Sequence, residues 1–203
     1  MLVHNVLLRE VYATEAEEDE QLWFLVSDRV IRFSKLEFGL ITGLNCDSNS
    51  EGLEILGDRR DSHRLWNQFF PGLQSIKQVH LDKFMEDTNF SVMDDQDALK
   101  IALVFFVERF LMGRDTRGRV DPFVMQLVDD LEAFNRYCWG TVSWELTYKY
   151  LSNALTGRAK KFKEQHKKNN KHKCERYNLE GIPIAFQVYA NLIYDFIMSV
   201  THF

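Results

Sequence analysis

The sequence predicts a mainly helical α+β protein, a compact multi-helix domain with a small β-hairpin near its N-terminus. Apolar residues recur at helical spacing through most of the chain, whereas one short early stretch follows the pattern of two strands. The 203 residues are 45% hydrophobic and include 16 Phe, which is enough to fill a substantial core. Because no Pro- or Ser-rich linker divides the chain, we expect a single domain over residues 1–203.

The first predicted elements are a short helix and the hairpin. Over residues 2–12, apolar side chains three to five positions apart predict an amphipathic helix. Residues 22–26 and 29–33 are rich in aromatic and β-branched side chains, and Ser27-Asp28 between them suits a two-residue turn. We therefore expect two antiparallel strands joined by a tight reversal.

A capping box opens the next predicted helix, over residues 35–42. The Ser34 hydroxyl can accept the amide hydrogen of the third helical residue, while Glu37 reaches back to the cap amide. Gly43 supplies the left-handed residue that ends such a helix. Residues 45–61 contain many turn-forming residues and are predicted to form a long loop.

Further helices are predicted after this loop. The strongest, over residues 96–112, has a centre that is apolar on nearly all sides, so we expect it to be the buried central helix. An Asp-Pro pair starts a helix over residues 122–135, and Trp139-Gly140 is expected to end it. The other predicted helices cover residues 63–70, residues 79–87, the residues from Thr141 onward, and residues 184–198.

Charge is unevenly distributed along the chain. The formal net charge of −5 excludes a globally basic protein that wraps nucleic acid. Residues 158–176 hold nine Lys or Arg and two Glu, a local net charge of +7, so the remaining chain carries −12. We call residues 158–176 the basic strip and expect it to form a loop or a helix extension within the domain. An acidic block at residues 15–20 is expected to form a solvated turn.

The basic strip has three interpretations that the sequence leaves open. Clustered cations attract phosphates, whose neutralisation releases counterions, so the strip could contact nucleic acid. It could equally be a nuclear-import signal or a solvated loop, and its single aromatic residue, Phe162, gives base stacking little support. In a nucleic-acid-binding protein, the contacts would come from Lys160, Lys161, Lys163, Lys167, Lys168, Lys171 and Lys173.

No residue pattern typical of catalysis, metal binding or cofactor binding is present. The motifs GxxxxGK[ST], GxGxxG and HExxH do not occur. Cys46 and Cys138 lack the surroundings of a nucleophile, and the spacing of His166, His172 and Cys174 fits no common zinc motif. We therefore expect no catalytic, cofactor-binding or metal-binding residues, and a protein that is not an enzyme.

Two pairs of adjacent carboxylates have a simpler interpretation than acid–base chemistry. Asp94-Asp95 lies at a predicted helix start, where the peptide dipoles favour negative charge. The members of the second pair, Asp129-Asp130, are neighbours on a predicted helix and so diverge by about 100°. Helix position alone accounts for both pairs.

Cysteine usage and hydropathy indicate the compartment. Three Cys, odd in number and far apart in sequence, fit no disulfide framework and indicate a reducing compartment, the nucleus or the cytoplasm. The longest uninterrupted apolar run, Ile101 to Val107, is far shorter than the about 20 residues that cross a bilayer. We expect no membrane partner.

Four long stretches, in order along the chain, carry a resemblance to a known family. They are EQLWFLVSDRVIRFSKLEFGLITGLNC (Glu20 to Cys46), ALVFFVERFLMGRD (Ala102 to Asp115), LVDDLEAFNRYCWGTVSWELTYKYL (Leu127 to Leu151) and YNLEGIPIAFQVYANLI (Tyr177 to Ile193). With these stretches the sequence resembles the plant domain of unknown function number nineteen-eighty-five. The resemblance implies a domain found upstream of SUMO-protease-like (Ulp-type) cysteine protease domains in plant proteins, many derived from Mutator-like transposable elements. The His, Asp, Gln and Cys set of such a protease is missing from this sequence.

These observations lead to one functional hypothesis and one rival. We expect a non-enzymatic protein-interaction or targeting domain of a plant protein, accessory to a SUMO protease or a transposon-derived polypeptide, with another protein as partner. The hairpin edge and residues 45–61 are candidate surfaces, because an exposed strand edge accepts an added strand. The rival is a nucleic-acid-binding module that acts through the basic strip. The large aromatic residues expected to build the core are Trp23, Phe33, Phe38, Trp139 and Trp144.

Overall fold

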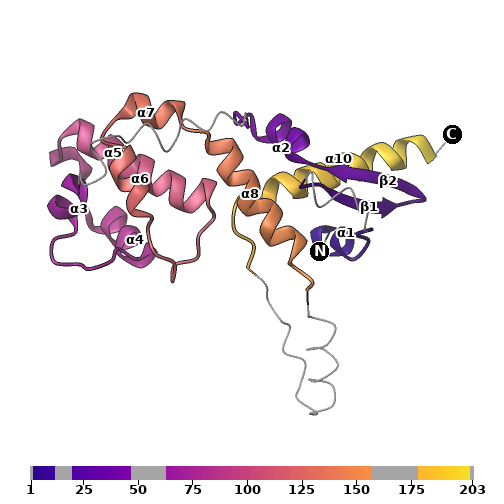
Figure 1. Cartoon of the computed structure of the whole chain (residues 1–203), viewed down its shortest axis with the longest axis horizontal. Helices are drawn as coiled ribbons and strands as arrows, with labels where there is room; N and C mark the ends of the chain where they lie inside the picture. Colours follow the sequence, from indigo (N-terminus) through magenta and orange to yellow (C-terminus); the bar gives the residue numbers. More distant parts are fainter. Residues whose placement is uncertain (1, 12–19, 47–62, 157–177, 202–203) are drawn as a thin grey trace, which may run out of the picture. The chain divides into compact units, whose positions relative to one another are not determined.

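The computed structural model describes residues 2–11, 20–46, 63–156 and 178–201 of the chain (Figure 1). The chain divides into two compact units, which are described separately below. The first unit comprises Met1–Cys46 and Val142–Phe203, and the second comprises Asp47–Thr141. Helices dominate both, and the strands form one antiparallel hairpin, so the mainly helical α+β class predicted from the sequence is confirmed. A single domain over residues 1–203 stays a prediction.

The hairpin of the first unit forms at the predicted residues. Ser27 and Asp28 have φ angles of 48° and 60°, as a tight two-residue reversal requires. The pairing runs from Leu22 opposite Phe33 to Val26 opposite Arg29. The elements of this unit are α1 (Leu2–Leu7), β1 (Leu22–Val26), β2 (Arg29–Phe33), α2 (Lys35–Thr42), most of α8 (Trp139–Ser152) and α10 (Pro183–Thr201).

Aromatic rings hold the hairpin and the helices of the first unit together. Phe33 lies with its ring centroid 5.5 Å from that of Trp144 and 5.2 Å from that of Phe186. The ring centroid of Phe38 from α2 also lies 5.5 Å from that of Trp144. All four side chains are fully buried, whereas Trp23 is half-buried, so three of the predicted core aromatics form the centre of this core.

The ends of α2 follow the sequence prediction. The backbone amide of Ser34 donates to Glu37 Oε2 at 2.8 Å, and the Ser34 side chain accepts from the amide of Leu36. Gly43 has φ 70° and its amide donates to the Gly39 carbonyl, which ends the helix. Local hydrogen bonding encoded by three residues therefore fixes where α2 begins and ends.

The start of α10 is fixed by close contact with α8. Gly181 has φ 81°, and a Cβ atom at this position would come within 2.7 Å of the Thr147 backbone nitrogen. The Ile182 amide donates to Thr147 Oγ1 at 2.8 Å, and Thr147 Oγ1 donates to the Ser143 carbonyl at 2.6 Å. Only glycine can occupy position 181 without moving the two segments apart.

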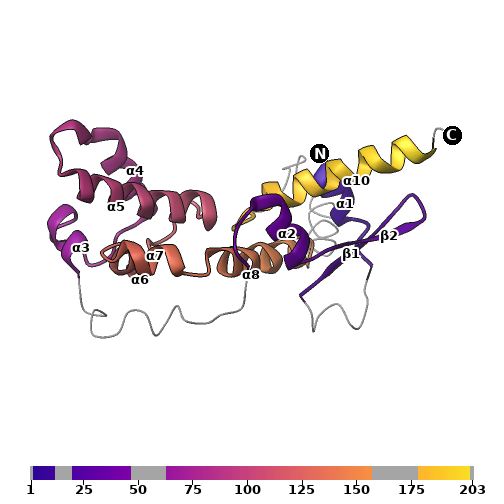
Figure 2. The same cartoon turned by 90° about the horizontal axis from the view of Figure 1, so that it is seen from above.

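The helix predicted to be central in the second unit is α5, which buries one face only. Figure 2 shows α5 lying between α4 and α6. Ile101 and Val104 on α5 and Val107 just after it are fully buried, but Leu99 and Phe106 are 48% and 47% exposed, so the prediction that the helix is buried on nearly all sides is wrong. The elements of this unit are α3 (Arg64–Phe69), α4 (Gln78–Asp87), η2 (Phe90–Val92), α5 (Asp95–Phe106), the π-helical segment η3 (Val107–Leu111), α6 (Pro122–Leu127) and α7 (Leu131–Arg136).

Several boundaries differ from the sequence prediction in this unit. The helix predicted over residues 96–112 changes after Phe106 into a π-helix, in which the Met112 amide donates to the Val107 carbonyl. The helix predicted over residues 122–135 is two helices, because the Asp130 carboxylate caps a new one by accepting from the Ala133 amide at 3.1 Å. The predicted break at Trp139-Gly140 is wrong, since α8 begins at Trp139.

Part of the sequence prediction falls outside the described residues. This holds for the basic strip, for the acidic block except Glu20, and for the predicted loop except Asn45 and Cys46. Of the described helices, none combines the length and the apolar character that crossing a bilayer requires.

Candidate functional site

Several of the residues that the sequence singled out lie outside the described part of the chain. The seven lysines of the basic strip lie outside the described residues, as do His166, His172 and Cys174. Cys46 is half-buried and its Sγ donates to the Leu44 carbonyl at 3.5 Å, while Cys138 is also half-buried. Within residues 2–11, 20–46, 63–156 and 178–201, no group of three or more His, Cys, Asp and Glu side chains is arranged to hold a metal ion.

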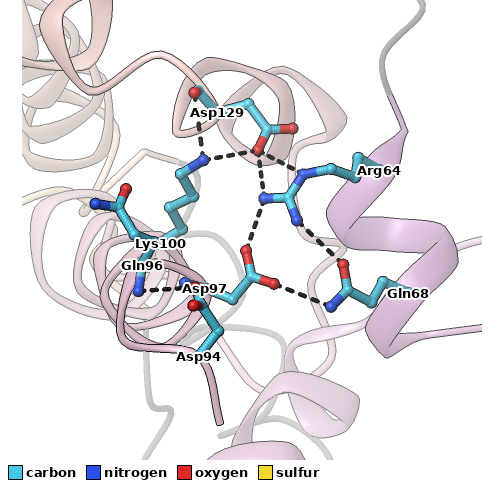
Figure 3. Close-up of polar contacts among 7 residues, drawn as sticks. All are labelled: Arg64, Gln68, Asp94, Gln96, Asp97, Lys100 and Asp129. Carbon is cyan, nitrogen blue, oxygen red and sulfur yellow. Dashed lines mark hydrogen bonds and ion pairs between the residues drawn. The ribbon is translucent and has the colours of Figure 1, made fainter.

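The most extensive polar cluster of the second unit surrounds Arg64 (Figure 3). Arg64 extends from α3, and its Nη2 lies 2.7 Å from Asp129 Oδ1 and 2.8 Å from Asp97 Oδ1. Lys100 on α5 places Nζ 3.1 Å from the same Asp129 oxygen, and Gln68 Nε2 donates to Asp97 Oδ2 at 2.9 Å. Two cations and two carboxylates therefore balance within one network that joins α3, α5 and the corner after α6.

The electrostatics of this network indicate a structural role. The hydrogen bond from Arg64 is the largest influence on Asp97 and holds the pKa of this carboxyl below its usual range. Asp97 and Asp129 are largely buried, with side chains 12% and 15% exposed, and their charges are compensated by Arg64 and Lys100. Such pairing keeps Asp97 charged and engages both carboxylates within the protein.

No pattern in the sequence reveals this network. The prediction that Asp129 and Asp130 are neighbours on one helix is wrong, because both residues lie between α6 and α7, where they have different roles. Asp130 caps α7, whereas Asp129 pairs with residues that are 29 and 65 positions away. Partners so distant in sequence produce no local pattern that could reveal the pairing.

A second polar centre is the buried Glu108 on the π-helical segment. Its side chain is 0% exposed, and the carboxylate accepts from Gln78 Nε2 at 2.5 Å and from the Asp121 amide at 2.8 Å. Arg114 Nε lies 3.3 Å from Glu108 Oε2. Burial is the largest influence on this group and raises the pKa of Glu108 above its ordinary value. In the sequence, this residue is visible only as one acid within an apolar run.

In the first unit, α10 presents an apolar face to solvent. Ile184, Val188, Leu192 and Phe196 follow at intervals of four and are 64%, 39%, 57% and 59% exposed; we call them the α10 ridge. The opposite face of the helix supplies buried core residues, among them Phe186 and Tyr189. Figures 1 and 2 show α10 running alongside the hairpin, and the Tyr189 hydroxyl donates to the Arg32 carbonyl of β2.

The described residues form two mainly helical units, and the first of them carries a short antiparallel hairpin. The family model for the Domain of unknown function (DUF1985) matches residues 7–150, and the chain belongs to this family. This confirms the resemblance found in the sequence. The α10 ridge lies after the matched residues. No curated protein and no solved structure matches the chain.

Proposed function

We propose that the chain is a non-enzymatic protein-interaction or targeting domain that binds its partner through the α10 ridge. The carrying observation is the exposure of four large apolar side chains in one row on a helix that buries Phe186, Tyr189 and Ala190 on its other side. Contiguous exposed apolar surface marks interaction sites in soluble proteins. Anchors at intervals of four on one helix are typical of recognition by a groove in the partner.

The pairing of charged groups supports a non-enzymatic function. Asp97 and Asp129 are occupied by Arg64 and Lys100, and Glu108 is enclosed beneath Arg114. A general base must reach a substrate proton, which groups held in this way do not.

The family supports a cellular setting for the proposed interaction. The resemblance implies that such domains occur in plant proteins, beside SUMO-protease-like domains and in transposon-derived polypeptides, and this implication supports the proposal. In this setting the chain would act as an accessory module, and its partner would be another protein in the nucleus or the cytoplasm. Charge is consistent with this proposal, since the exposed α10 face holds a single charged residue, Asp195, among its described side chains.

Quantitative capture from plant nuclear and cytoplasmic extracts tests the proposal. The double variant Leu192→Ser/Phe196→Ser should weaken binding of the main partner about thirtyfold and lower its recovery accordingly, because each of the two lost apolar anchors contributes about 1 kcal/mol or more. The matched control is Val79→Ser/Val92→Ser, which changes two exposed valines in the second unit, 49% and 82% exposed. Equal recovery by the wild type and the ridge variant would contradict the proposal.

The basic strip supports a second candidate function, nucleic-acid binding. Its local net charge of +7 on an otherwise acidic chain is the observation that favours it. Replacing all seven strip lysines by Gln should abolish a gel shift with RNA or DNA, and the wild-type affinity should fall steeply with rising salt. If the gel shift persists after the replacement, or if the affinity does not change with salt concentration, the strip is not the nucleic-acid contact.

A further inference from the structure

The second unit carries a shallow depression where α5 gives way to the π-helical segment. Its volume is about 540 Å³, and it opens broadly to solvent. Phe105, Arg109 and Phe110 line it from the helical side. The loop that follows contributes Gly113, Arg114, Asp115 and Thr116. We call this set of residues the arginine–phenylalanine depression. π-Helical turns are rare, and they occur frequently at functional sites.

Exposed aromatic rings form one wall of the depression. Phe110 is 61% exposed although it lies in a unit with a well-packed core. Its ring is stacked on Phe106 with centroids 5.7 Å apart and meets the edge of Phe105 at 6.3 Å. Phe106 itself is 47% exposed. The ring of Phe110 is therefore held in place by its neighbours while much of its surface faces water, as in a preformed contact for an apolar side chain.

Two guanidinium groups form the polar part of the depression, and each forms an ion pair with a carboxylate. Arg109 Nε lies 3.2 Å from Asp82 Oδ1, and Arg109 Nη1 donates to the Arg114 carbonyl at 2.7 Å. Arg114 Nε faces the buried Glu108 at 3.3 Å. Among the described residues, no hydrogen bond engages Arg114 Nη1 or Nη2 or Arg109 Nη2. These are the nitrogens that a planar carboxylate or phosphate would engage.

The surroundings favour a carboxylate over a polyphosphate. Asp115 lies on the rim of the depression, where the hydrogen bond from Arg117 lowers the pKa of its carboxyl to about 2, so it stays charged at neutral pH. This carboxylate is paired with Arg117 at 2.7 Å, and what remains of its negative potential repels a dense row of phosphates more than a single carboxylate.

We propose that the arginine–phenylalanine depression binds a short acidic segment of a partner protein, with a large apolar side chain on Phe110 and an adjacent carboxylate on the free edges of Arg109 and Arg114. Its open form fits an extended peptide better than an enclosed small molecule. The inference rests on the proposed interaction function, to which it adds the chemistry of a partner. The depression lies in the second unit and the α10 ridge in the first, so an experiment that excludes one site does not exclude the other.

Fluorescence anisotropy with the whole chain tests this inference. The probe is a labelled short peptide of alternating Glu and Phe, and the comparison peptides replace Glu by Gln or Phe by Ala. The wild type should bind the probe saturably, and both comparison peptides should bind about tenfold more weakly or worse. Equal binding of all three peptides would overturn the inference.

Variants then locate the binding. Phe110→Ala removes an exposed ring and should weaken the affinity for the probe about tenfold. Val92→Ala, at an 82% exposed position of the same unit, should leave this affinity unchanged. Arg114→Lys keeps the positive charge facing Glu108 but loses the planar edge, and should also weaken binding. Equal affinities of Phe110→Ala and Val92→Ala would contradict the site.

Two further measurements separate this inference from its alternatives. Leu192→Ser/Phe196→Ser on the α10 ridge should bind the probe as tightly as the wild type does, so the two proposals can fail independently. Inorganic phosphate and single-stranded DNA should displace the probe only weakly. Displacement by DNA that persists after the strip lysines are replaced would overturn the peptide proposal in favour of a phosphate ligand.

Discussion

At the level of single residues, one carboxylate oxygen of Asp129 accepts the hydrogen bonds from both cations of its network. Its Oδ1 accepts from Arg64 Nε and Nη2 and from Lys100 Nζ, whereas its Oδ2 is buried without a hydrogen-bond partner. A carboxylate with one crowded and one bare oxygen depends on its cations to stay buried. The network therefore stabilises the packing of α3 against the rest of the second unit.

The substitution Asp129→Asn should destabilise the protein by about 1–3 kcal/mol, because Arg64 and Lys100 lose a shared charged acceptor. Urea unfolding followed by circular dichroism measures the change. Glu132→Gln is the control, since Glu132 lies 3.8 Å from Arg136 and both side chains are mostly exposed. Loss of such a surface pair costs about 0.5 kcal/mol or less. Similar costs for the two variants would show that the Arg64 network is no more than a surface feature.

Glu108 makes a different prediction, one about pH. Burial raises the pKa of Glu108 above 4.5, so the folded state keeps its proton to a higher pH than the unfolded state does. The stability that the protonated group contributes is complete below about pH 4.5 and is lost as the pH rises through the folded-state pKa. Glu108→Gln should therefore gain stability relative to the wild type as the pH rises through this window. Parallel stability curves for the two proteins against pH would refute this assignment.

Single residues with local partners could be predicted from the sequence, whereas residues with distant partners could not. Ser34, Glu37 and Gly43 act within one helix, and the structure confirms all three. Arg64, Glu108 and Arg114 acquire their roles only when separate helices meet, and no short pattern marks them. This explains why the sequence yielded the helix caps but neither polar centre nor the arginine–phenylalanine depression.

At the element scale, the contact between Gly181 and Thr147 sets the start of α10. Gly181→Ala should be severely destabilising, by about 3 kcal/mol or more, because the new Cβ would collide with backbone as well as with a side chain. Gly72→Ala is the matched control, since Gly72 also has a positive φ, 77°, but has nothing within 4 Å of an added Cβ. Its cost should be about 1–2 kcal/mol, from backbone strain alone.

Thermal unfolding of the two glycine variants measures the difference. If Gly181→Ala were no more costly than Gly72→Ala, α10 would have to sit further from α8 than the structure places it. Such a result would also remove the rigid support on which the α10 ridge depends.

Element types were easier to predict than element ends. The hairpin residues 22–26 and 29–33 and the helix 35–42 match the structure because turn and cap residues mark them directly. The π-helical segment after Phe106 could not be predicted, because the apolar pattern does not distinguish a π-helix from an α-helix. This segment contains the buried Glu108, which accepts from the Asp121 amide. The end of α6 was missed because the Asp130 cap competes successfully with helix continuation.

At the scale of the whole molecule, composition predicted the class of fold but not its division. Residues 1–46 and 142–203 form one compact unit although nearly a hundred residues separate them in sequence. No change in composition marks this division, because both units contain helices with one apolar face. Each unit carries one candidate surface, the α10 ridge in the first and the arginine–phenylalanine depression in the second.

Site-specific photo-crosslinking tests the proposal that a partner protein binds the α10 ridge. A photoreactive phenylalanine analogue placed at position 192 should trap one discrete partner in plant cells. The same analogue at position 92, which is more exposed in the structure, should trap none. A partner trapped equally from both positions, or only from position 92, would contradict the claim.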